Sequence, residues 1–306
     1  MKKIFNLNFW EKKNHPISLI LLPFTLVYNF LTILNKTKSL FAPNLKIKVI
    51  CVGNLYVGGT GKTPLVKKIY HSLKKEINCC IIKKKRIDHI DEINLLKQDS
   101  KIITPNNRLS GLIDAEKQGF TMAIIDDGMQ DYRFKKDISI LCIKSKKKFG
   151  NEKVLPSGPL RENLNNIRNY KIAVINGEKD KYIENILIKH NPEIKIFYSN
   201  YIIKNLSNLQ GIKFLAFSGI ADNNSFFDIL RKNNINIIET VGFKDHHNFT
   251  ENDLAKLIKI SKEKNISLIT TDKNYSNIDP KYKNQIYYTS LDLNINDYEK
   301  FLNEIN

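Results

Sequence analysis

Cysteine is scarce in this chain, and none of the cysteine spacings suits a metal site. The four cysteines are Cys51, Cys79, Cys80 and Cys142. Each lies in or beside an apolar run that is typical of a strand, and the adjacent Cys79 and Cys80 would point to opposite faces of one strand. The pattern excludes a cysteine-bound metal and predicts buried free thiols in a reducing cytoplasm.

Acidic residues are also few compared with basic ones. The 306-residue chain holds 31 Asp and Glu against 49 Lys and Arg, which gives a formal net charge of +18. Such a charge would suit a nucleic acid, an acidic membrane surface or a phosphorylated substrate. The lysines are spread along the chain, however, and a genome that favours Lys, Asn and Ile explains them equally well. The charge alone therefore identifies no partner.

One long run without charge lies near the N-terminus, at residues 17–34. Its length is at the lower limit for a membrane-spanning helix. A signal peptide is an alternative, but the run starts late and no small-residue cleavage site follows it. On a helical wheel the polar residues of the run form one narrow stripe: Ser18, Thr25, Asn29 and Thr32. We predict that residues 1–42 form a membrane-associated helical segment that lies in the interface rather than spanning it, with a buried core helix as the alternative.

Beyond this segment, short apolar runs alternate with helical patterns, and no repeat is evident. The runs typical of buried strands are 47–52, 79–82, 122–126, 138–143, 172–175, 194–198, 213–217, 235–241, 266–271 and 285–289. The alternation predicts an α/β fold: a P-loop-type, mainly parallel sheet with helices on both faces, followed by a smaller second α/β domain. A polar stretch around 161–170 suggests a boundary near residue 165, which gives domains 43–165 and 166–306.

The stretch VGNLYVGGTGKTP, at 52–64, ends like a phosphate-binding loop but has Tyr56 where the full pattern begins with glycine. Such a loop surrounds phosphate oxygens with backbone N–H groups, while its lysine reaches the β- and γ-phosphates and its hydroxyl binds Mg²⁺. The corresponding residues are Gly58, Gly59 and Gly61 for the backbone, Lys62 for the cation and Thr63 for the hydroxyl. Because the departure affects only the entrance of the loop, the sequence predicts a nucleotide phosphate site.

Two adjacent acids end another apolar strand. In MAIIDDGMQD, Asp126 and Asp127 follow the buried run at once. Carboxylates at this edge of a sheet are where P-loop enzymes hold Mg²⁺ or its water shell. Together with the loop, they predict chemistry on a magnesium nucleotide.

Further motifs follow in order: LPSGPLRE at 155–162 and FKDHHNFT at 243–250. With VGNLYVGGTGKTP and DDGMQD, they resemble the tetraacyldisaccharide 4′-kinases, the lipid A 4′-kinases, whose pattern runs VGN-x-x-VGG-x-GKTP, DDGFQH, LP-x-GPLRE and F-x-DH. LLPFTLVY at 21–28, SGIADNNSFF at 218–227 and TTDKN at 270–274 extend the resemblance over nearly the whole chain. That family also replaces the leading glycine of the loop.

The resemblance implies a kinase on the cytoplasmic face of the bacterial inner membrane, anchored by the N-terminal apolar helix. Such an enzyme transfers the γ-phosphate of ATP, with Mg²⁺, to the 4′-hydroxyl of a tetraacylated glucosamine disaccharide 1-phosphate and so makes the lipid A precursor lipid IVA. The implied partners are this lipid substrate and inner-membrane lipids. Neither a nucleic acid nor an obligate protein partner is implied.

The resemblance also assigns site residues position by position. Catalytic roles fall on Lys62, on Asp91 as the base and on His246 as the partner of that base. Nucleotide contacts are implied for Gly58, Gly59, Thr60, Gly61, Lys62, Thr63 and Arg108. The implied metal site contains Thr63, Glu92, Asp126, Asp127 and Gln130, and Glu162 ends the GPLRE motif.

The chain departs from the family pattern in three places. Where the family usually has Ser-Arg-Gly-Tyr-Gly, this chain has a shortened segment with the basic run 83–86. Such a run is typical of a solvated surface, and contact with the substrate phosphate or with anionic lipid is the alternative. The DDGFQH motif appears with Met129 and Asp131, and TTDKN carries aspartate in place of glutamate.

Two other functions stay open. A membrane-associated P-loop ATPase of the partitioning or targeting kind also uses GG-x-GKT, but it carries a signature lysine where this chain has Val57. A non-catalytic relative whose site has decayed is the second alternative. The altered segment at 83–86 is the reason to consider it. A GTPase is disfavoured, since no N-K-x-D motif for base recognition is present.

Overall fold

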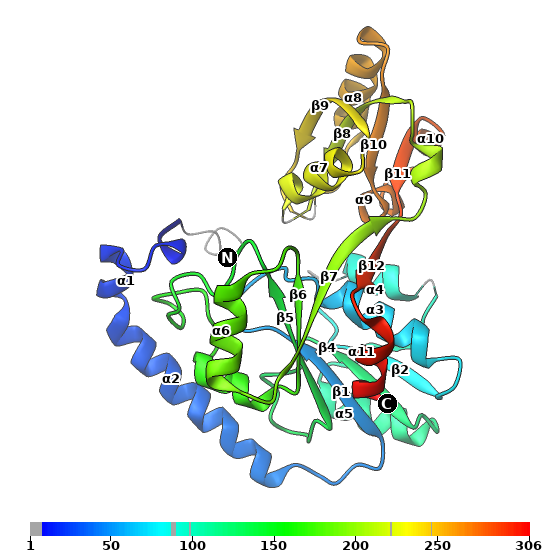
Figure 1. Ribbon diagram of the computed structural model, residues 1–306. Helices are drawn as coiled ribbons and strands as arrows, with labels where there is room; N and C mark the ends of the chain where they lie inside the picture. Colours follow the sequence, from blue (N-terminus) through cyan, green and yellow to red (C-terminus); the bar gives the residue numbers. More distant parts are fainter. Residues whose placement is uncertain (1–7, 87–89, 98, 221, 246) are drawn as a thin grey trace. The chain divides into compact units, whose positions relative to one another are not determined.

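The computed structural model describes residues 8–86, 90–97, 99–220, 222–245 and 247–306 (Figure 1). The chain divides into two compact units. The first unit comprises Met1–Arg86, Leu96–Asn200 and Asn294–Asn306, and the second comprises Ile87–Leu95 and Tyr201–Leu293. Each unit is built on its own sheet.

The large sheet has eight strands in the order β12-β7-β6-β5-β1-β4-β2-β3. In chain order the strands are β1 Lys48–Gly53, β2 Cys79–Lys83, β3 Ile102–Ile103, β4 Met122–Asp126, β5 Ile138–Lys144, β6 Ile172–Asn176, β7 Lys195–Ile203 and β12 Leu291–Ile295. All pairings from β3 through β7 are parallel. A mainly parallel sheet, as predicted, is therefore confirmed.

Both faces of the central strands are buried. Every residue of β2 and β4 is buried, and so is all of β1 after Lys48. Since successive side chains of a strand point to opposite faces, layers must cover the sheet on both sides. All four cysteines are buried free thiols in this sheet, as the sequence predicted.

Helices and short 3₁₀ turns connect these strands. The helices are α1 Pro16–Ile20, α2 Leu22–Lys36, α3 Lys62–Leu73, α5 Arg108–Lys117, α6 Lys181–His190 and α11 Tyr298–Ile305, and the 3₁₀ turns are η1 Asn8–Glu11, η2 Thr37–Phe41 and η4 Leu164–Asn169. Helix α4, Ile90–Lys97, lies between β2 and β3 in the chain but belongs largely to the second unit. The C-terminal helix α11 packs on the sheet, where the ring of Phe301 meets that of Phe197 at 5.3 Å between centroids. Phe301 is fully buried by this contact.

The N-terminal apolar run forms two helices rather than one. The helical run breaks at Leu21, between α1 and α2. Ser18 and Thr25, from the predicted polar stripe, are buried against the 155–162 segment: the Ser18 hydroxyl donates to the Ser157 carbonyl at 2.6 Å, and the Thr25 and Ser157 hydroxyls lie 2.7 Å apart. These two residues of the polar stripe therefore face the protein. Among the helices of the described residues, none is both long enough and apolar enough to span a membrane.

The second unit holds a four-stranded parallel sheet in the order β11-β10-β8-β9. Its strands are β8 Lys213–Ser218, β9 Asn236–Gly242, β10 Ser267–Thr271 and β11 Ile286–Thr289. Its helices are α7 Asn223–Lys232, α8 Glu251–Glu263, α9 Asp272–Ser276 and α10 Pro280–Lys283, with the 3₁₀ turn η5 Leu206–Asn208. Apolar clusters line both faces of β8, one around Phe214 and one around Phe217.

The division of the chain differs from the predicted boundary near residue 165. Strand β6 and the first part of β7 continue the large sheet beyond β5, so residues up to Asn200 belong to the first unit. The chain then returns to that unit at Asn294. The polar stretch around 161–170 is not a linker: it contains the 3₁₀ turn η4, and Ile167 and Tyr170 within it are buried in the core of the first unit.

Candidate functional site

Three adjacent strands deliver the predicted site residues to one edge of the large sheet. Strand β1 runs into the Gly-rich loop, its neighbour β4 ends at Asp126, and β2 on the far side of β4 ends at Lys83. In the register of the sheet Asp126 pairs with Val52 on one side and with Lys83 on the other. Open parallel sheets bind ligands beyond the carboxyl ends of their strands, so this edge is the place to look for chemistry.

The Gly-rich loop has the conformation that a phosphate-binding loop needs. Gly61 has φ 92° and forms the N-cap of α3, which begins at Lys62. Gly58 has φ 113°, and its carbonyl accepts a hydrogen bond from the Asn54 side chain at 3.2 Å. Residues with side chains rarely adopt such φ values. The strand, loop and helix follow one another as predicted, and the N-terminus of a helix is a favourable place for an anion.

Tyr56, in the place of the leading glycine, holds the entrance of the loop. Its hydroxyl donates to Glu11 at 2.6 Å, and its backbone forms an antiparallel bridge with Leu160. The N–H of Val57 donates to the carbonyl of Pro159 at 2.9 Å. The backbone contacts hold the loop against the 155–162 segment. The hydrogen bond to Glu11 needs the tyrosine side chain, which glycine lacks.

We expect Gly58→Ala to weaken ATP binding by roughly tenfold. An added Cβ would meet nothing within 4 Å, so the cost is that of holding alanine at φ 113°, about 1–3 kcal/mol. The loop would relax and move its N–H groups out of alignment. Titration calorimetry with ATP measures the change.

Gly119→Ala is the matched control. Gly119 has φ 81° and equally open surroundings, but it lies in the turn after α5. Its replacement should lower stability by a similar amount and leave ATP affinity unchanged. Equal ATP affinities for the two variants would contradict the role of Gly58.

Thr63, Asp126 and Lys83 form a closed triangle at the edge of the sheet. The Thr63 hydroxyl donates to Asp126 Oδ2 at 2.8 Å. The Lys83 ammonium donates to the same carboxylate oxygen and lies 3.2 Å from Thr63 Oγ1. Lys83 is only 4% exposed, so the prediction that the basic run 83–86 is a solvated surface is wrong for its first residue. Lys85 and Arg86, beyond the strand, are exposed.

The side chains at this triangle fit a magnesium site of the P-loop kind. Asp126 is 1% exposed, and its Oδ1 has no hydrogen-bond partner among the described residues; the buried hydroxyl of Thr60 in the loop likewise has none there. Nowhere in the described part of the chain do three or more His, Cys, Asp or Glu side chains form a cluster that could hold a metal. Mg²⁺ needs no such cluster, because it usually takes one or two protein oxygens and completes its shell with waters and phosphates.

Asp127 joins the loop lysine to an arginine of the GPLRE motif. Its Oδ1 lies 3.6 Å from the Lys62 ammonium and 2.8 Å from Arg161 Nη1. Burial alone would raise the pKa of the Asp127 carboxyl, but the charges of Lys62 and Arg161 outweigh burial and hold the pKa well below its usual value. Asp127 therefore stays ionised and fixes both cations. Arg161 is not among the site residues predicted from the sequence, although it stands in the motif LPSGPLRE.

Gln130 and Arg108 contact other protein groups. The Gln130 amide donates to the Asn54 carbonyl at 3.3 Å and accepts from Arg161 at 3.4 Å. Arg108 begins α5, with Nη1 3.9 Å from Asp131, and its buried Nε has no hydrogen-bond partner among the described residues. The predicted roles of both residues, metal and nucleotide contact, stay predictions.

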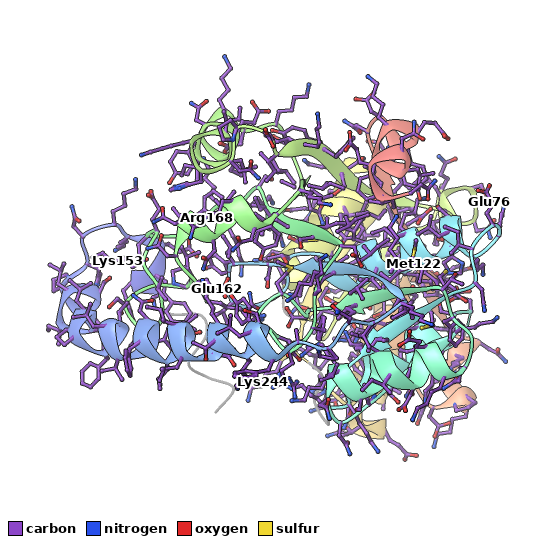
Figure 2. The ribbon with its side chains drawn as sticks, turned by 90° about the horizontal axis from the view of Figure 1, so that it is seen from below. Glu76, Met122, Lys153, Glu162, Arg168 and Lys244 are labelled. Carbon is purple, nitrogen blue, oxygen red and sulfur yellow. The ribbon has the colours of Figure 1, made fainter. Side chains whose placement is uncertain are left out.

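A cavity of about 200 Å³ opens between α2 and the GPLRE motif. Its lining residues are Tyr28, Leu31, Thr32, Asn35, Gln130, Tyr132, Arg161 and Glu162. Figure 2 labels Glu162 beside the long helix α2. Glu162 is 4% exposed and accepts a hydrogen bond from the Tyr132 hydroxyl, and burial raises the pKa of its carboxyl. The cavity thus combines apolar walls with a buried acid and the arginine that reaches Asp127.

The side chains of three predicted residues lie outside the part of the chain that the structure describes. His246 lies outside the described residues, as do the side chains of Asp91 and Glu92, whose backbone belongs to α4. Asp245, next to His246, is described. The pairing of Asp91 with His246 therefore stays a prediction.

Comparison with known proteins gives a consistent result. The family model described as tetraacyldisaccharide-1-P 4′-kinase matches residues 17–84 and 84–306. The tetraacyldisaccharide 4′-kinase of Pelagibacter ubique is 37% identical over 302 residues, which cover 97% of this chain and 96% of that protein. The enzyme of the same name from Rickettsia akari is 34% identical over 327 residues, with 99% and 97% covered.

A solved structure resembles the fold over nearly its whole length. It is LpxK from Aquifex aeolicus in complex with ATP, with a TM-score of 0.72 and 25% identity. The match covers 94% of this chain and 98% of that chain.

Proposed function

The chain belongs to the tetraacyldisaccharide-1-phosphate 4′-kinase family, and from that premise we propose that it transfers the γ-phosphate of ATP to the 4′-hydroxyl of a tetraacylated glucosamine disaccharide 1-phosphate. The product is the bisphosphorylated lipid A precursor. ATP is the donor, as the ATP complex of the Aquifex relative supports.

One observation carries this proposal beyond family membership. Arg161 lines the cavity beside α2 and pairs with Asp127, which also pairs with Lys62 of the phosphate loop. The cavity and the loop therefore share one network of charges. A sugar phosphate lipid that entered the cavity with its polar head would present its hydroxyl close to the phosphate end of ATP.

Where ATP binds, each group of the phosphate loop has a separate role. The N–H groups from Gly58 to Thr63 cradle the phosphates, and Lys62 offsets the charge that spreads over the γ-phosphoryl oxygens during transfer. Asp127 orients Lys62 through its ion pair at 3.6 Å. Arg161 adds a second cation to the same network.

Mg²⁺ is the cation that we propose for the triangle. The Thr63 hydroxyl and the Asp126 carboxylate would hold it, with Glu92, Asp127 and Gln130 as further candidates from the family resemblance. Bound there, Mg²⁺ would neutralise charge on the β- and γ-phosphate oxygens. The buried Asp126 Oδ1, without a partner among the described residues, supports this assignment.

At the acceptor end, a base must take the proton of the sugar hydroxyl as it attacks. Asp91, oriented by His246, is our candidate on the family resemblance. We expect Asp91→Asn to lower kcat by roughly 10²–10⁴-fold, because the amide cannot accept the proton. Single-turnover phosphate transfer measures the change. Wild-type kcat in this variant would remove Asp91 from the role of base.

The activity itself is tested with purified full-length protein in detergent. ATP, Mg²⁺ and the tetraacyl disaccharide 1-phosphate should yield a bisphosphorylated lipid, detectable by thin-layer chromatography with labelled ATP. ATP hydrolysis that does not depend on the lipid, without product, would favour the partitioning-type ATPase. Neither activity would favour the relative with a decayed site.

We further propose that the protein lies on the cytoplasmic face of the bacterial inner membrane, with α1 and α2 in the interface. These two helices expose many large apolar side chains: Ile17, Leu19, Ile20, Leu22, Phe24, Leu26, Val27, Phe30, Leu31, Ile33 and Leu34. Soluble proteins rarely expose so large an apolar patch without a partner. Lysines flank it, Lys12 and Lys13 before and Lys36 and Lys38 after, which suits anionic headgroups.

Replacing two exposed phenylalanines of α2 should weaken membrane binding. Phe24 and Phe30 are 62% and 59% exposed, so Phe24→Ser with Phe30→Ser leaves the packing of α2 intact. Burial of a phenylalanine side chain is worth about 1.5–3 kcal/mol, so vesicle binding should fall at least about tenfold. Co-sedimentation with phosphatidylglycerol-containing vesicles measures it. The control pair, Ile188→Ser with Ile238→Ser, removes exposed side chains elsewhere and should bind as wild type does.

A further inference from the structure

Lys83 ends β2 in a place where the family resemblance supplies no lysine. The basic run 83–86 stands where the related kinases usually have Ser-Arg-Gly-Tyr-Gly, so no role is inherited for it. Its first residue points back into the fold instead of into solvent, with 4% of its surface exposed. A buried lysine is rare without a specific partner. Here the partner is Asp126.

The contact places a positive charge on the carboxylate that would hold a metal. Asp126 Oδ2 accepts from both Lys83 and Thr63, and the ammonium also lies 3.2 Å from the Thr63 hydroxyl. The Asp126 carboxylate, whose Oδ1 has no partner among the described residues, and the Thr63 hydroxyl are the protein ligands that we propose for Mg²⁺. In the register of the sheet Lys83 lies directly beside Asp126, so the pairing follows from the strand positions themselves.

We propose that the Lys83 ammonium and a divalent cation are alternative partners of Asp126, so that the metal enters only when Lys83 moves aside. The single charge of the Lys83 ammonium and the double charge of a divalent cation would repel each other strongly beside one buried carboxylate, because little water screens them there. The lysine stem is flexible, with four methylene groups, and its ammonium can turn to another anion without a change in the backbone. A nucleotide triphosphate in the loop would supply that anion.

Lys83 is thus a positioning residue for the metal. Without nucleotide it neutralises Asp126, holds Thr63 in place and keeps the divalent cation weakly bound. This inference rests on the metal role proposed above for Thr63 and Asp126. The test measures metal binding without ATP or lipid. A negative result would therefore not argue against the kinase activity, and a protein without kinase activity could still give a positive result.

The experiment is a titration of the nucleotide-free, full-length protein in detergent with Mn²⁺, followed by the electron paramagnetic resonance signal of the free ion. We expect Lys83→Met to bind Mn²⁺ at least tenfold more tightly than wild type, with Mg²⁺ competing. Lys83→Gln, whose amide can still donate to Asp126 but carries no charge, should also bind more tightly and serves if the methionine variant does not fold. Lys84→Met removes the same charge one residue further along and should bind as wild type does.

Thermal melting distinguishes a change in metal affinity from a general loss of stability. Without divalent cations, Lys83→Met should melt below wild type, because Asp126 loses its buried counter-charge. Mn²⁺ should then raise the melting temperature of Lys83→Met more than that of wild type. Adding Asp126→Asn to Lys83→Met should abolish the tighter binding. Equal Mn²⁺ affinities in wild type, Lys83→Met and Lys83→Gln, or an equal gain in Lys84→Met, would overturn the proposal.

Discussion

Replacing Lys62 with methionine is expected to lower kcat/KM for phosphate transfer by about 10³-fold or more. The ammonium is the loop's own cation, and removal of one group that stabilises transition-state charge costs about 10²–10³-fold in enzymes of known mechanism, with larger losses for cations on a transferred phosphoryl group. Methionine keeps most of the length of the side chain, so the variant removes charge rather than packing. Initial rates of lipid phosphorylation at several ATP concentrations measure the effect.

The loss should appear mainly in kcat, because Lys62 acts on charge that develops during transfer. Asp127 would keep its ion pair with Arg161 at 2.8 Å, so the fold around the loop should survive. Lys67→Met on the same helix α3 is the control, because Lys67 pairs with Asp99 at 2.9 Å rather than with Asp127. If Lys62→Met kept activity within tenfold of wild type, the loop would not be the donor site.

Asp126→Asn is expected to have an effect of similar size, with a different signature. The amide keeps the shape of the carboxylate and can still accept from Thr63, but it offers no charge to a divalent cation. We expect kcat to fall about 10³-fold and not to recover at high Mg²⁺, while ATP binding in the absence of Mg²⁺ stays close to wild type. A kcat titration against Mg²⁺ and calorimetry without Mg²⁺ provide the two measurements.

Stability should change in the same variant. Breaking a buried ion pair by neutralising one member costs about 3–5 kcal/mol, because Lys83 would remain buried without its counter-charge. Chemical denaturation followed by circular dichroism checks this. Asp114→Asn, on the exposed side of α5, is the control and should change neither quantity. Full activity of Asp126→Asn at ordinary Mg²⁺ would exclude Asp126 from the metal site.

The sequence predicted the strands of this fold well because most of them are buried on both faces. The ten apolar runs correspond to ten of the strands, β1, β2 and β4 to β11. The two that were missed have no such signal: β3 is only two residues long, and β12 alternates with polar residues in LDLNI. Both are edge strands, where one side of the backbone needs no partner strand and hydrophobic runs are short.

The site was predicted in part for a similar reason. Gly58, Lys62, Thr63 and Asp126 lie in motifs whose local spacing already implies their geometry. Lys83 did not stand out, because a lysine among other basic residues predicts solvent, and only the register of β2 against β4 places it beside Asp126. No rule of spacing connects residues that far apart in the chain.

The closing strand of the large sheet has a consequence for how the protein is made on the ribosome. Strand β12 and helix α11 lie at the C-terminal end of the chain, after the whole second unit, and β12 forms the edge of the sheet next to β7. Domains tend to fold as they emerge, at roughly 5–20 residues per second. The first unit therefore stays unfinished, with Phe197 uncovered, until the second has been synthesised and Phe301 arrives to cover that ring. A nascent chain stalled before residue 291 would present an open strand edge to chaperones, whereas the phosphate loop and its strands would already be complete.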